Sequence, residues 1–273
     1  MSNGTEERTE RANWIREIEA RAWIDFVAAA PAPTRQELGL SYIRSDHCVL
    51  LACPRIPAVP FNRAFAISPR WYREASEVNA NLQWLRQHAA AGWVVQVDED
   101  DLELASPQLK KRNLYDTSRG WMKFLSTTPS TGPMIFEIRR SEEDGVDLDF
   151  SQIVQQGMGF PPEVRPWLMA LAARQGWHCY VIYKDGRPAA AAAMFRQATG
   201  AWLGIDVTLP PYRGLGMQAA LIQKRLSDLG PGRAMAETGL PAATHQAADA
   251  SYRNYQRGGF IEAYPSINFA ASR

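Results

Sequence analysis

The sequence has few cysteines, no marked excess of charge of either sign, and no long apolar run. Its 273 residues include three cysteines, Cys48, Cys53 and Cys179. This odd and small number is typical of reduced thiols rather than of a disulfide framework. His47 stands beside Cys48, but no second pair at a metal-binding spacing follows, so we expect no metal site. Thirty Lys and Arg balance 29 Asp and Glu, which excludes a global field that would attract nucleic acid.

No stretch approaches the ~18 apolar residues that a membrane span requires. The opening residues, MSNGTEERTERANW, are acidic and polar and lack the apolar core of a signal peptide. We therefore expect a cytoplasmic protein without a membrane partner. In contrast to these absences, 46% of the residues are apolar, with nine Trp, ten Phe and nine Tyr, which is enough for a substantial core.

The apolar periodicity breaks at residues 126–133, STTPSTGP, which we interpret as a linker between two halves of ordinary domain size. In the first half the pattern predicts a helix over 8–29, strands in HCVLLAC and NRAFAIS, a helix over 76–91 and a strand over 93–97.

The second half opens with MIFEIRRS, followed by predicted helices at 149–157 and 162–174. An Asp-Gly turn joins the strands WHCYVIY and PAAAAAMF as a hairpin. The strand TGAWLGIDVTL leads into PPYRGLGMQAAL and a helix of about 13 residues. RAMAET, AADASYRNYQRGG and FIEAYPSINFAA then predict a strand, a short helix and a terminal strand or pair.

The turn PPYRGLGMQAAL, residues 210–221, joins a predicted strand to a predicted helix. Backbone N–H groups at the positive end of a helix favour a phosphate ligand. Gly214 and Gly216 allow the backbone to approach that ligand without a Cβ in the way. Arg213 directly before them favours an anion over a merely tight turn.

Two other phosphate-binding motifs are less suitable. A P-loop is excluded because Gly-x-x-x-x-Gly-Lys-Ser/Thr is absent. A dinucleotide fingerprint fits Gly214, Gly216 and Ala219, with Glu237 at a later strand end. Against it, Pro210–Arg213 separate the strand from the first glycine, and too little chain follows Glu237 for further parallel strands.

The remaining mode is binding of the coenzyme A pyrophosphate, and here a family resemblance becomes specific. VTLPPYRGLGMQAALI resembles motif A of the GNAT N-acetyltransferases, Arg/Gln-x-x-Gly-x-Gly/Ala, with Arg213, Gly216 and Gln218 on the motif. Gln218 replaces the usual small residue, but its backbone N–H is the functional group. SYRNYQRGGF, residues 251–260, resembles motif B, in which a tyrosine, here Tyr255, precedes a Gly-Phe pair.

The resemblance covers residues 134–273 and implies an α+β fold with a mixed sheet, the GNAT acyl-CoA N-acyltransferase fold. The first half follows a similar order of elements but lacks Arg-x-x-Gly-x-Gly. We therefore predict two tandem domains. Residues 1–130 would be a degenerate GNAT-like copy that provides packing and one wall of a substrate cleft, and 134–273 the catalytic domain. An unrelated α+β domain in the first half is the alternative.

The resemblance also implies which residues contact acetyl-CoA. The oxyanion donor is expected among the backbone N–H groups near Val207 to Leu209, where the strands splay apart. The predicted coenzyme contacts are Val207, Thr208, Leu209, Arg213, Gly214, Leu215, Gly216, Met217, Gln218 and Asn254.

Acetyl transfer to an amine requires a neutral nucleophile and a leaving thiolate that acquires a proton. An alkyl ammonium of pKa ~10 must lose a proton before attack, so a carboxylate base is expected. Asp206 and Glu237 are the candidates, with a purely structural carboxylate as the alternative for each. By resemblance Tyr255 protonates the thiolate, and the alternative is a core tyrosine with a hydrogen-bonded hydroxyl.

Strict strand alternation has a consequence for the candidate base Asp206. It predicts one face with Trp202, Gly204 and Asp206 and an opposite face with Leu203, Ile205 and Val207.

The acceptor site is expected beside GMGFPPEVRPW, where Met158, Phe160 and Trp167 form an apolar wall or simply pack in the core. The sequence thus predicts an N-acetyltransferase that moves an acetyl group from acetyl-CoA to a primary amine of a small molecule, amino acid or peptide by direct attack. The alternative is a non-catalytic acyl-CoA-binding sensor or regulatory protein. The expected partners are acetyl-CoA and an amine, with no nucleic acid, and a homodimer is left open.

Overall fold

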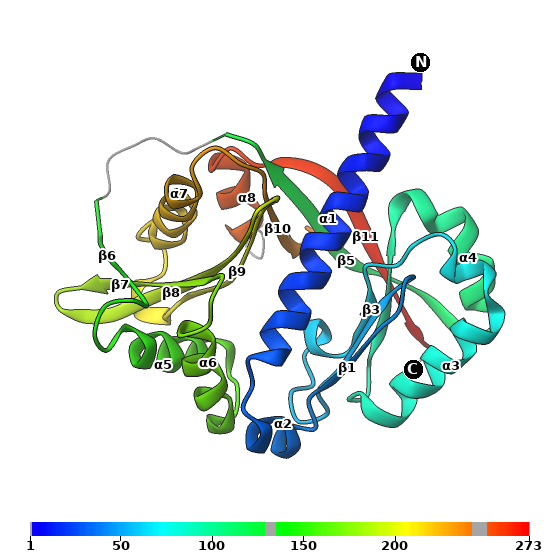
Figure 1. Cartoon of the computed structure of the whole chain (residues 1–273), viewed down its shortest axis with the longest axis horizontal. Coiled ribbons are helices and arrows are strands. Elements are labelled where there is room, and N and C mark those ends of the chain that lie inside the picture. The colour runs from blue at the N-terminus through cyan, green and yellow to red at the C-terminus, as the bar shows by residue number, and fades with distance from the viewer. Residues whose placement is uncertain (1, 129–134, 242–249, 273) are drawn as a thin grey trace. The chain divides into compact units, whose positions relative to one another are not determined.

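A computed structural model describes residues 2–128, 135–241 and 250–272 (Figure 1) and divides the chain into two compact units. Unit 1 contains Met1–Val27, Arg35–Lys123 and Ala263–Arg273, and unit 2 contains Ala28–Thr34 and Phe124–Glu262. No helix in the described ranges combines the length and the apolar character that crossing a membrane requires.

Unit 1 is a mixed sheet with helices. Within it the strands lie in the order β1-β2-β3-β4-β11-β5; β3 and β4 are parallel, and β1–β2, β2–β3 and β4–β11 are antiparallel. The helices are α1 (Ser2–Ala28), α2 (Ala32–Leu38), α3 (Ala75–His88) and α4 (Leu102–Lys110), with 3-10 turns at Val59–Phe61, Trp71–Arg73 and Glu99–Asp101. The strands are β1 (Ser41–Arg44), β2 (Val49–Ala52), β3 (Arg63–Phe65), β4 (Val94–Asp98), β5 (Leu114–Ser126) and β11 (Ile261–Ala271).

Helix α3 shows how the sequence builds this unit. Val78, Leu82 and Leu85 follow one another at spacings of four and three, so they share one face of the helix, and all three are buried in a core with Leu50 and Val95 of the sheet. The four residues of β2 are buried as well, as expected for a strand that is covered on both faces.

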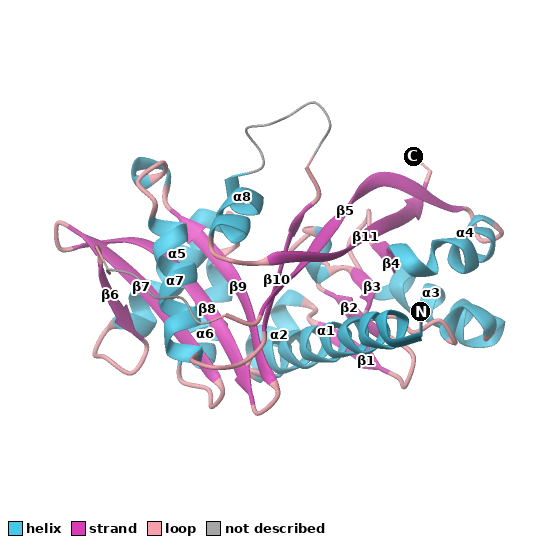
Figure 2. Cartoon of the chain, turned by 90° about the horizontal axis from the view of Figure 1, so that it is seen from above, coloured by secondary structure: helices cyan, strands magenta, loops and turns pink. Residues whose placement is uncertain are grey.

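The terminal strand β11 lies in unit 1, between β4 and β5. Ile267 is opposite Val97 and Phe269 is opposite Val95, and Figure 2 shows β11 alongside β5. The boundary predicted at 134–273 put this strand with the second half, and the structure corrects that placement. The reason is that sequence order does not determine which strands a terminal strand pairs with.

The strands of unit 2 also form a mixed arrangement, in the order β10-β9-β8-β7-β6. Only β9 and β10 of this set are parallel; β6–β7, β7–β8 and β8–β9 are antiparallel. Helices α5 and α6 cover one face of the sheet and α7 covers the other (Figure 1). The strands are β6 (Glu137–Arg140), β7 (Trp177–Lys184), β8 (Arg187–Gln197), β9 (Gly200–Thr208) and β10 (Ala234–Gly239). The helices are α5 (Val146–Met158), α6 (Arg165–Ala172), α7 (Met217–Leu229) and α8 (Ala250–Arg257), with 3-10 turns at Pro162–Val164 and Pro210–Tyr212.

The predicted elements of unit 2 are present at nearly the predicted positions. The β7–β8 hairpin turns at Asp185 and Gly186, whose φ angles of 51° and 71° fit a turn that needs positive φ at both central residues. The predicted linker lies outside the described residues over 129–133, as does the start of the predicted helix at 247–249.

A cluster of charged side chains is buried in the core of unit 1. Glu19 on α1 accepts from Lys123 Nζ at 2.8 Å and lies 3.2 Å from Arg63 Nη2. Arg63 donates to Gln96 Oε1 at 2.6 Å, and Gln96 donates to Ser266 Oγ on β11 at 2.8 Å. Arg63, Glu19 and Lys123 are at most 2% exposed. The cluster therefore joins α1 to four strands of the sheet by charge-assisted hydrogen bonds.

We expect Glu19→Gln to destabilise the protein by about 3–5 kcal/mol, because it leaves two buried cations without their anion. Glu17→Gln is the matched control on the same helix, since Glu17 pairs with Arg44 at an exposed position and such pairs contribute at most about 1 kcal/mol. Urea denaturation of both variants measures the difference, and equal losses would show that the buried cluster does not stabilise unit 1.

Candidate functional site

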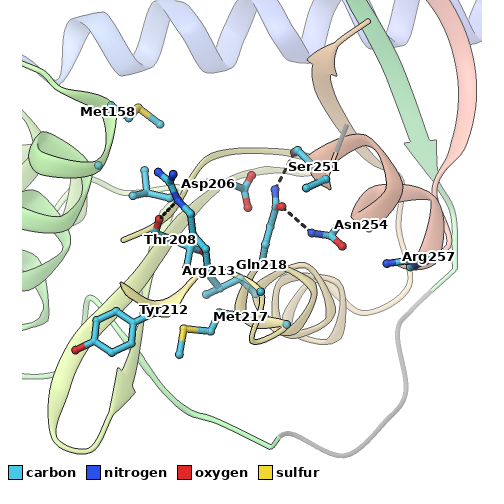
Figure 3. Close-up of a pocket in the computed structure, with 16 residues that line it drawn as sticks. Met158, Asp206, Thr208, Tyr212, Arg213, Met217, Gln218, Ser251, Asn254 and Arg257 are labelled. Atoms are coloured by element: carbon cyan, nitrogen blue, oxygen red, sulfur yellow. Dashed lines mark hydrogen bonds between the residues drawn. The ribbon is translucent and has the colours of Figure 1, made fainter. Parts of the chain in front are cut away.

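A cavity of about 690 Å³ opens in unit 2 at the start of α7 (Figure 3). Its walls come from the end of α5, the end of β9, the turn that follows β9, the first turns of α7, and α8. Its lining consists of Gly157, Met158, Asp206, Val207, Thr208, Tyr212, Arg213, Gly214, Gly216, Met217, Gln218, Leu221, Ala250, Ser251, Asn254 and Arg257.

Two glycines shape the turn before α7. Gly214 and Gly216 have φ angles of 81° and 83°, in the left-handed region that only glycine adopts without cost. A Cβ on either residue would meet no atom within 4 Å, so the space in front of both is open. Gly216 is the N-cap of α7 and offers no side chain, which leaves the first N–H groups of this positive helix end for a ligand. Arg213, beside them, donates through Nε to the Thr208 carbonyl at 3.2 Å.

Polar side chains connect the first turn of α7 to α8. Gln218 donates through Nε2 to Ser251 Oγ at 2.8 Å, and Asn254 donates through Nδ2 to Gln218 Oε1 at 2.9 Å (Figure 3). The long side chain that departs from the usual small residue of the motif therefore bonds to α8. Its backbone stays at the helix start.

A β-bulge in β9 determines where Asp206 points. Gly204 is opposite Ala193 and Val207 is opposite Ala191, so one residue of β8 faces two residues of β9, at 205 and 206. Gly204 and Val207 consequently share a face.

The bulge contradicts the predicted alternation. Val207 faces α5, because its Cγ1 lies 2.1 Å from where a Cβ would be if Gly157 had one. The carboxylate of Asp206, in contrast, contacts Arg225 on α7 and Tyr255 on α8. The prediction that Trp202, Gly204 and Asp206 share one face of the strand was therefore wrong. The inserted residue has a cost, because Ile205 has a φ of 57°, which is strained for a β-branched side chain.

Asp206 is held at both of its oxygens. Its Oδ1 accepts from Arg225 Nη2 at 2.5 Å and its Oδ2 accepts from the Tyr255 hydroxyl at 2.7 Å. Arg225 is 0% and Tyr255 1% exposed, whereas the Asp206 side chain is 12% exposed and lines the cavity. Burial, then the charge of Asp206, raises the pKa of Tyr255 well above its usual value. The phenol is therefore neutral and donates.

The structure brings together eight of the ten predicted coenzyme contacts at the cavity, along with Asp206 and Met158. Leu209 and Leu215 do not line it, nor do Glu237 and Tyr255. Phe160 is also absent from the lining, and Trp167 is 0% exposed in the core, so only Met158 of the predicted apolar wall contributes.

Sequence reasoning missed several residues of the site. Arg257 lines the cavity; it lies within SYRNYQRGGF but is not one of the positions that carry the resemblance to motif B. Arg225 holds Asp206; its spacing of four residues from Leu221 was the available signal, because it places Arg225 on the apolar side of α7. Among the described residues no group of His, Cys, Asp and Glu is arranged to hold a metal ion.

The sequence matches no protein-family model and no curated protein sequence. The structure is similar to solved ones. A GCN5-related N-acetyltransferase from Sphaerobacter thermophilus superposes with a TM-score of 0.59, 16% identity, and coverage of 82% of this chain and 80% of that chain. A GCN5-related N-acetyltransferase from Kribbella flavida superposes with a TM-score of 0.54 and 15% identity, and the match covers 89% of this chain and 94% of that chain. A tandem GNAT protein from the clavulanic acid biosynthesis pathway superposes with a TM-score of 0.52 and 14% identity, and the match covers 92% of this chain and 93% of that chain.

These similarities confirm the predicted fold. The chain has the α+β GNAT fold, a mixed sheet with helices. The similarity to the tandem protein extends over 92% of the chain, in agreement with two GNAT-like domains.

The strained bulge predicts an unusual order of variant stabilities. At a regular strand position, a glycine variant is normally less stable than the alanine variant by roughly 0.5–1 kcal/mol. At Ile205 we expect Ile205→Gly to be more stable than Ile205→Ala by about 1 kcal/mol, because glycine has no steric penalty at positive φ. At Leu203, in the regular part of β9, the alanine variant should be the more stable one. Thermal unfolding of the four variants tests this, and the same order at both sites would contradict a strained Ile205.

Proposed function

We propose that the chain is an N-acetyltransferase that transfers an acetyl group from acetyl-CoA to a primary amine of a small molecule, an amino acid or a peptide. One observation carries the proposal: a single cavity contains both an open helix N-terminus at Gly214 and Gly216 and a carboxylate, Asp206, that is fixed by two partners. The first suits a phosphate and the second suits a base.

The residues present fit the coenzyme. The backbone from Gly214 to Gln218 would receive the pyrophosphate at the start of α7, and Arg213 adds a positive charge. No Cβ obstructs the turn, and a volume of about 690 Å³ is in the range of sites that enclose organic ligands. When bound, the coenzyme supplies an activated acetyl thioester. Asn254, at the cavity wall, is a further proposed contact.

Thr208 is the best placed oxyanion donor. The Leu209 N–H donates to the Ala189 carbonyl at 3.0 Å, so it is already used. Alternation along β9 then directs the Thr208 N–H away from β8. On that side the pairing of β9 with β10 extends only over 201–203, and the N–H would meet the negative charge that develops on the thioester oxygen.

Asp206 is the proposed base. It would accept a proton from the ammonium form of the acceptor, directly or through water, and the neutral amine nitrogen would then attack the thioester carbonyl carbon. When the C–S bond breaks, the nitrogen loses its second proton, and this balances the proton that the leaving thiolate takes up. Glu237 is the weaker candidate because it does not line the cavity. Tyr255 donates its proton to Asp206, so in this arrangement it supports the base, and protonation of the thiolate by Tyr255 would require its hydroxyl to change partner.

Release of free CoA thiol tests the function. We expect acetyl-CoA to release thiol with at least one class in a panel of amines, amino acids and peptides, and the acetylated amine to appear by mass spectrometry in equal amount. Binding of acetyl-CoA without turnover over the whole panel would instead favour the acyl-CoA-binding sensor.

Ligand binding should depend on the glycine turn. We expect acetyl-CoA, but not NAD, to raise the melting temperature, because a ligand that binds only the folded state stabilises it. Gly216→Asp should abolish this shift by placing a side chain and a negative charge at the helix start. Gly145→Asp is the matched control, since Gly145 is the N-cap of α5 with a φ of 79° and equally open surroundings. Loss of the shift in both variants, or stabilisation by NAD alone, would contradict the assignment.

Tyr255→Phe should lower kcat by about 10-fold or more while acetyl-CoA affinity stays near the wild-type value. The ring and its packing are retained, so the loss reports on the hydroxyl. If that hydroxyl supports Asp206, the acid limb of the pH profile should move to higher pH, because the carboxylate loses a donor that favours its charged form. If it protonates the thiolate, the alkaline limb should change. Wild-type kcat in a variant whose chemical step limits the rate would exclude both roles.

A further inference from the structure

We propose that Arg225 is a positioning residue for the base. Its guanidinium holds the Asp206 carboxylate oriented toward the cavity, although Arg225 does not line the cavity itself. The use of this arrangement in acetyl transfer rests on the proposed function, whereas the hold on Asp206 can be tested separately.

The guanidinium is fixed by the backbone on three of its sides. Nε donates to the Leu221 carbonyl at 3.0 Å, and Nη1 donates to the Ala193 carbonyl at 3.0 Å and lies 3.4 Å from the Gly204 carbonyl. These acceptors belong to α7, β8 and β9. Nη2 is thereby directed at Asp206 Oδ1. A planar group bound in this way cannot rotate away from the carboxylate, in contrast to an exposed arginine.

Stability alone does not account for a charge at this position. Arg225 is one helical turn after Leu221 and is 0% exposed, where an apolar side chain would pack without a desolvation cost. Replacing a buried ion pair by apolar residues of similar volume is often neutral or stabilising. The pair therefore points to a role for the carboxylate at the site.

The hold leaves Asp206 able to react. Each carboxylate oxygen has two lone pairs; Arg225 occupies one on Oδ1 and Tyr255 one on Oδ2. One lone pair on each oxygen remains for an amine or a water molecule in the cavity. Two-point binding also fixes the plane of the carboxylate, which a base needs to meet its substrate in one orientation.

The charges around Asp206 set the expected pH dependence. Arg225 faces it from α7 and Tyr255 from α8; Arg213 and Arg257 line the same cavity from the turn and from α8, and Glu237 on the neighbouring strand does not line it. Arg225 is the cation in direct contact. The charge of Asp206 raises the pKa of Arg225 against the opposing effect of burial, so the guanidinium stays charged throughout the working range.

The experiment compares Arg225→Met, Arg225→Lys and the control Lys224→Met, which alters the neighbouring residue and its pair with Asp228 on the same helix. For Arg225→Met we expect kcat to fall about 10- to 100-fold. The acid limb of kcat/KM should move to higher pH, because a carboxylate without its cation is protonated more readily. The melting shift with acetyl-CoA should persist. Arg225→Lys should restore the position of the acid limb, because lysine keeps the positive charge. It should restore only part of kcat, because the lysine ammonium lacks the planar, several-donor geometry of the guanidinium that orients the carboxylate. Lys224→Met should behave as wild type.

A second readout does not depend on turnover. In protein with ¹³C-labelled aspartate carboxyl groups, the Asp206 signal, assigned by its loss in Asp206→Asn, should titrate at higher pH in Arg225→Met than in wild type. If the wild type releases no thiol with any amine, the proposed function fails. The titration then still tests whether Arg225 holds the Asp206 carboxylate. If Arg225→Met does not fold, Arg225→Lys decides, with reduced kcat and an unmoved acid limb expected. An unchanged Asp206 titration, or equal kcat losses in Arg225→Lys and Lys224→Met, would overturn the proposal.

Discussion

The candidate site of unit 2 depends on one extra residue in β9. Without the bulge at 205 and 206, Asp206 would share a face with Trp202 and Gly204, and its carboxylate would meet neither α7 nor α8. The strain of Ile205 at a φ of 57° is the local cost, on the order of 1–3 kcal/mol. In exchange, a charged group lies beside an open helix start. Arg225 and Tyr255 both donate to Asp206. The bulge therefore also supplies the hydrogen-bond acceptor that these two buried side chains need.

Unit 1 lacks this arrangement at the corresponding turn after its strand β3. The residues between β3 and α3 include Trp71 and Tyr72, which are 0% and 3% exposed and pack in the core. Glu74 is the N-cap of α3, and Glu77 lies in its first turn. These carboxylates suit the positive end of a helix but would repel a phosphate. This difference accompanies the absence of Arg-x-x-Gly-x-Gly from the first half of the sequence.

Much of the fold and the turn could be predicted from the sequence, because these features are local. The Asp-Gly hairpin, the helix over Met217–Leu229 and the two glycines at positive φ each follow from a few adjacent residues. The bulge could not be predicted, because it depends on the register between β8 and β9. Arg225 was missed because a charged residue is expected on the solvated face of a helix. The roles expected for Glu237 and Phe160 depended on long-range packing, and neither residue lines the cavity.

The position of β11 has a consequence for how the protein forms. Domains usually fold as units during synthesis, the N-terminal one first. Here residues 263–271 lie between β4 and β5 of unit 1, and the ribosome makes them only after all of unit 2. Until then the facing edges of β4 and β5 in unit 1 lack their partner strand, and Val95, Gln96 and Val97 are unpaired on that side. The unit that begins the chain is therefore the last to be completed, and in the interval its open edges are sites for pairing with another nascent chain or for binding by a chaperone.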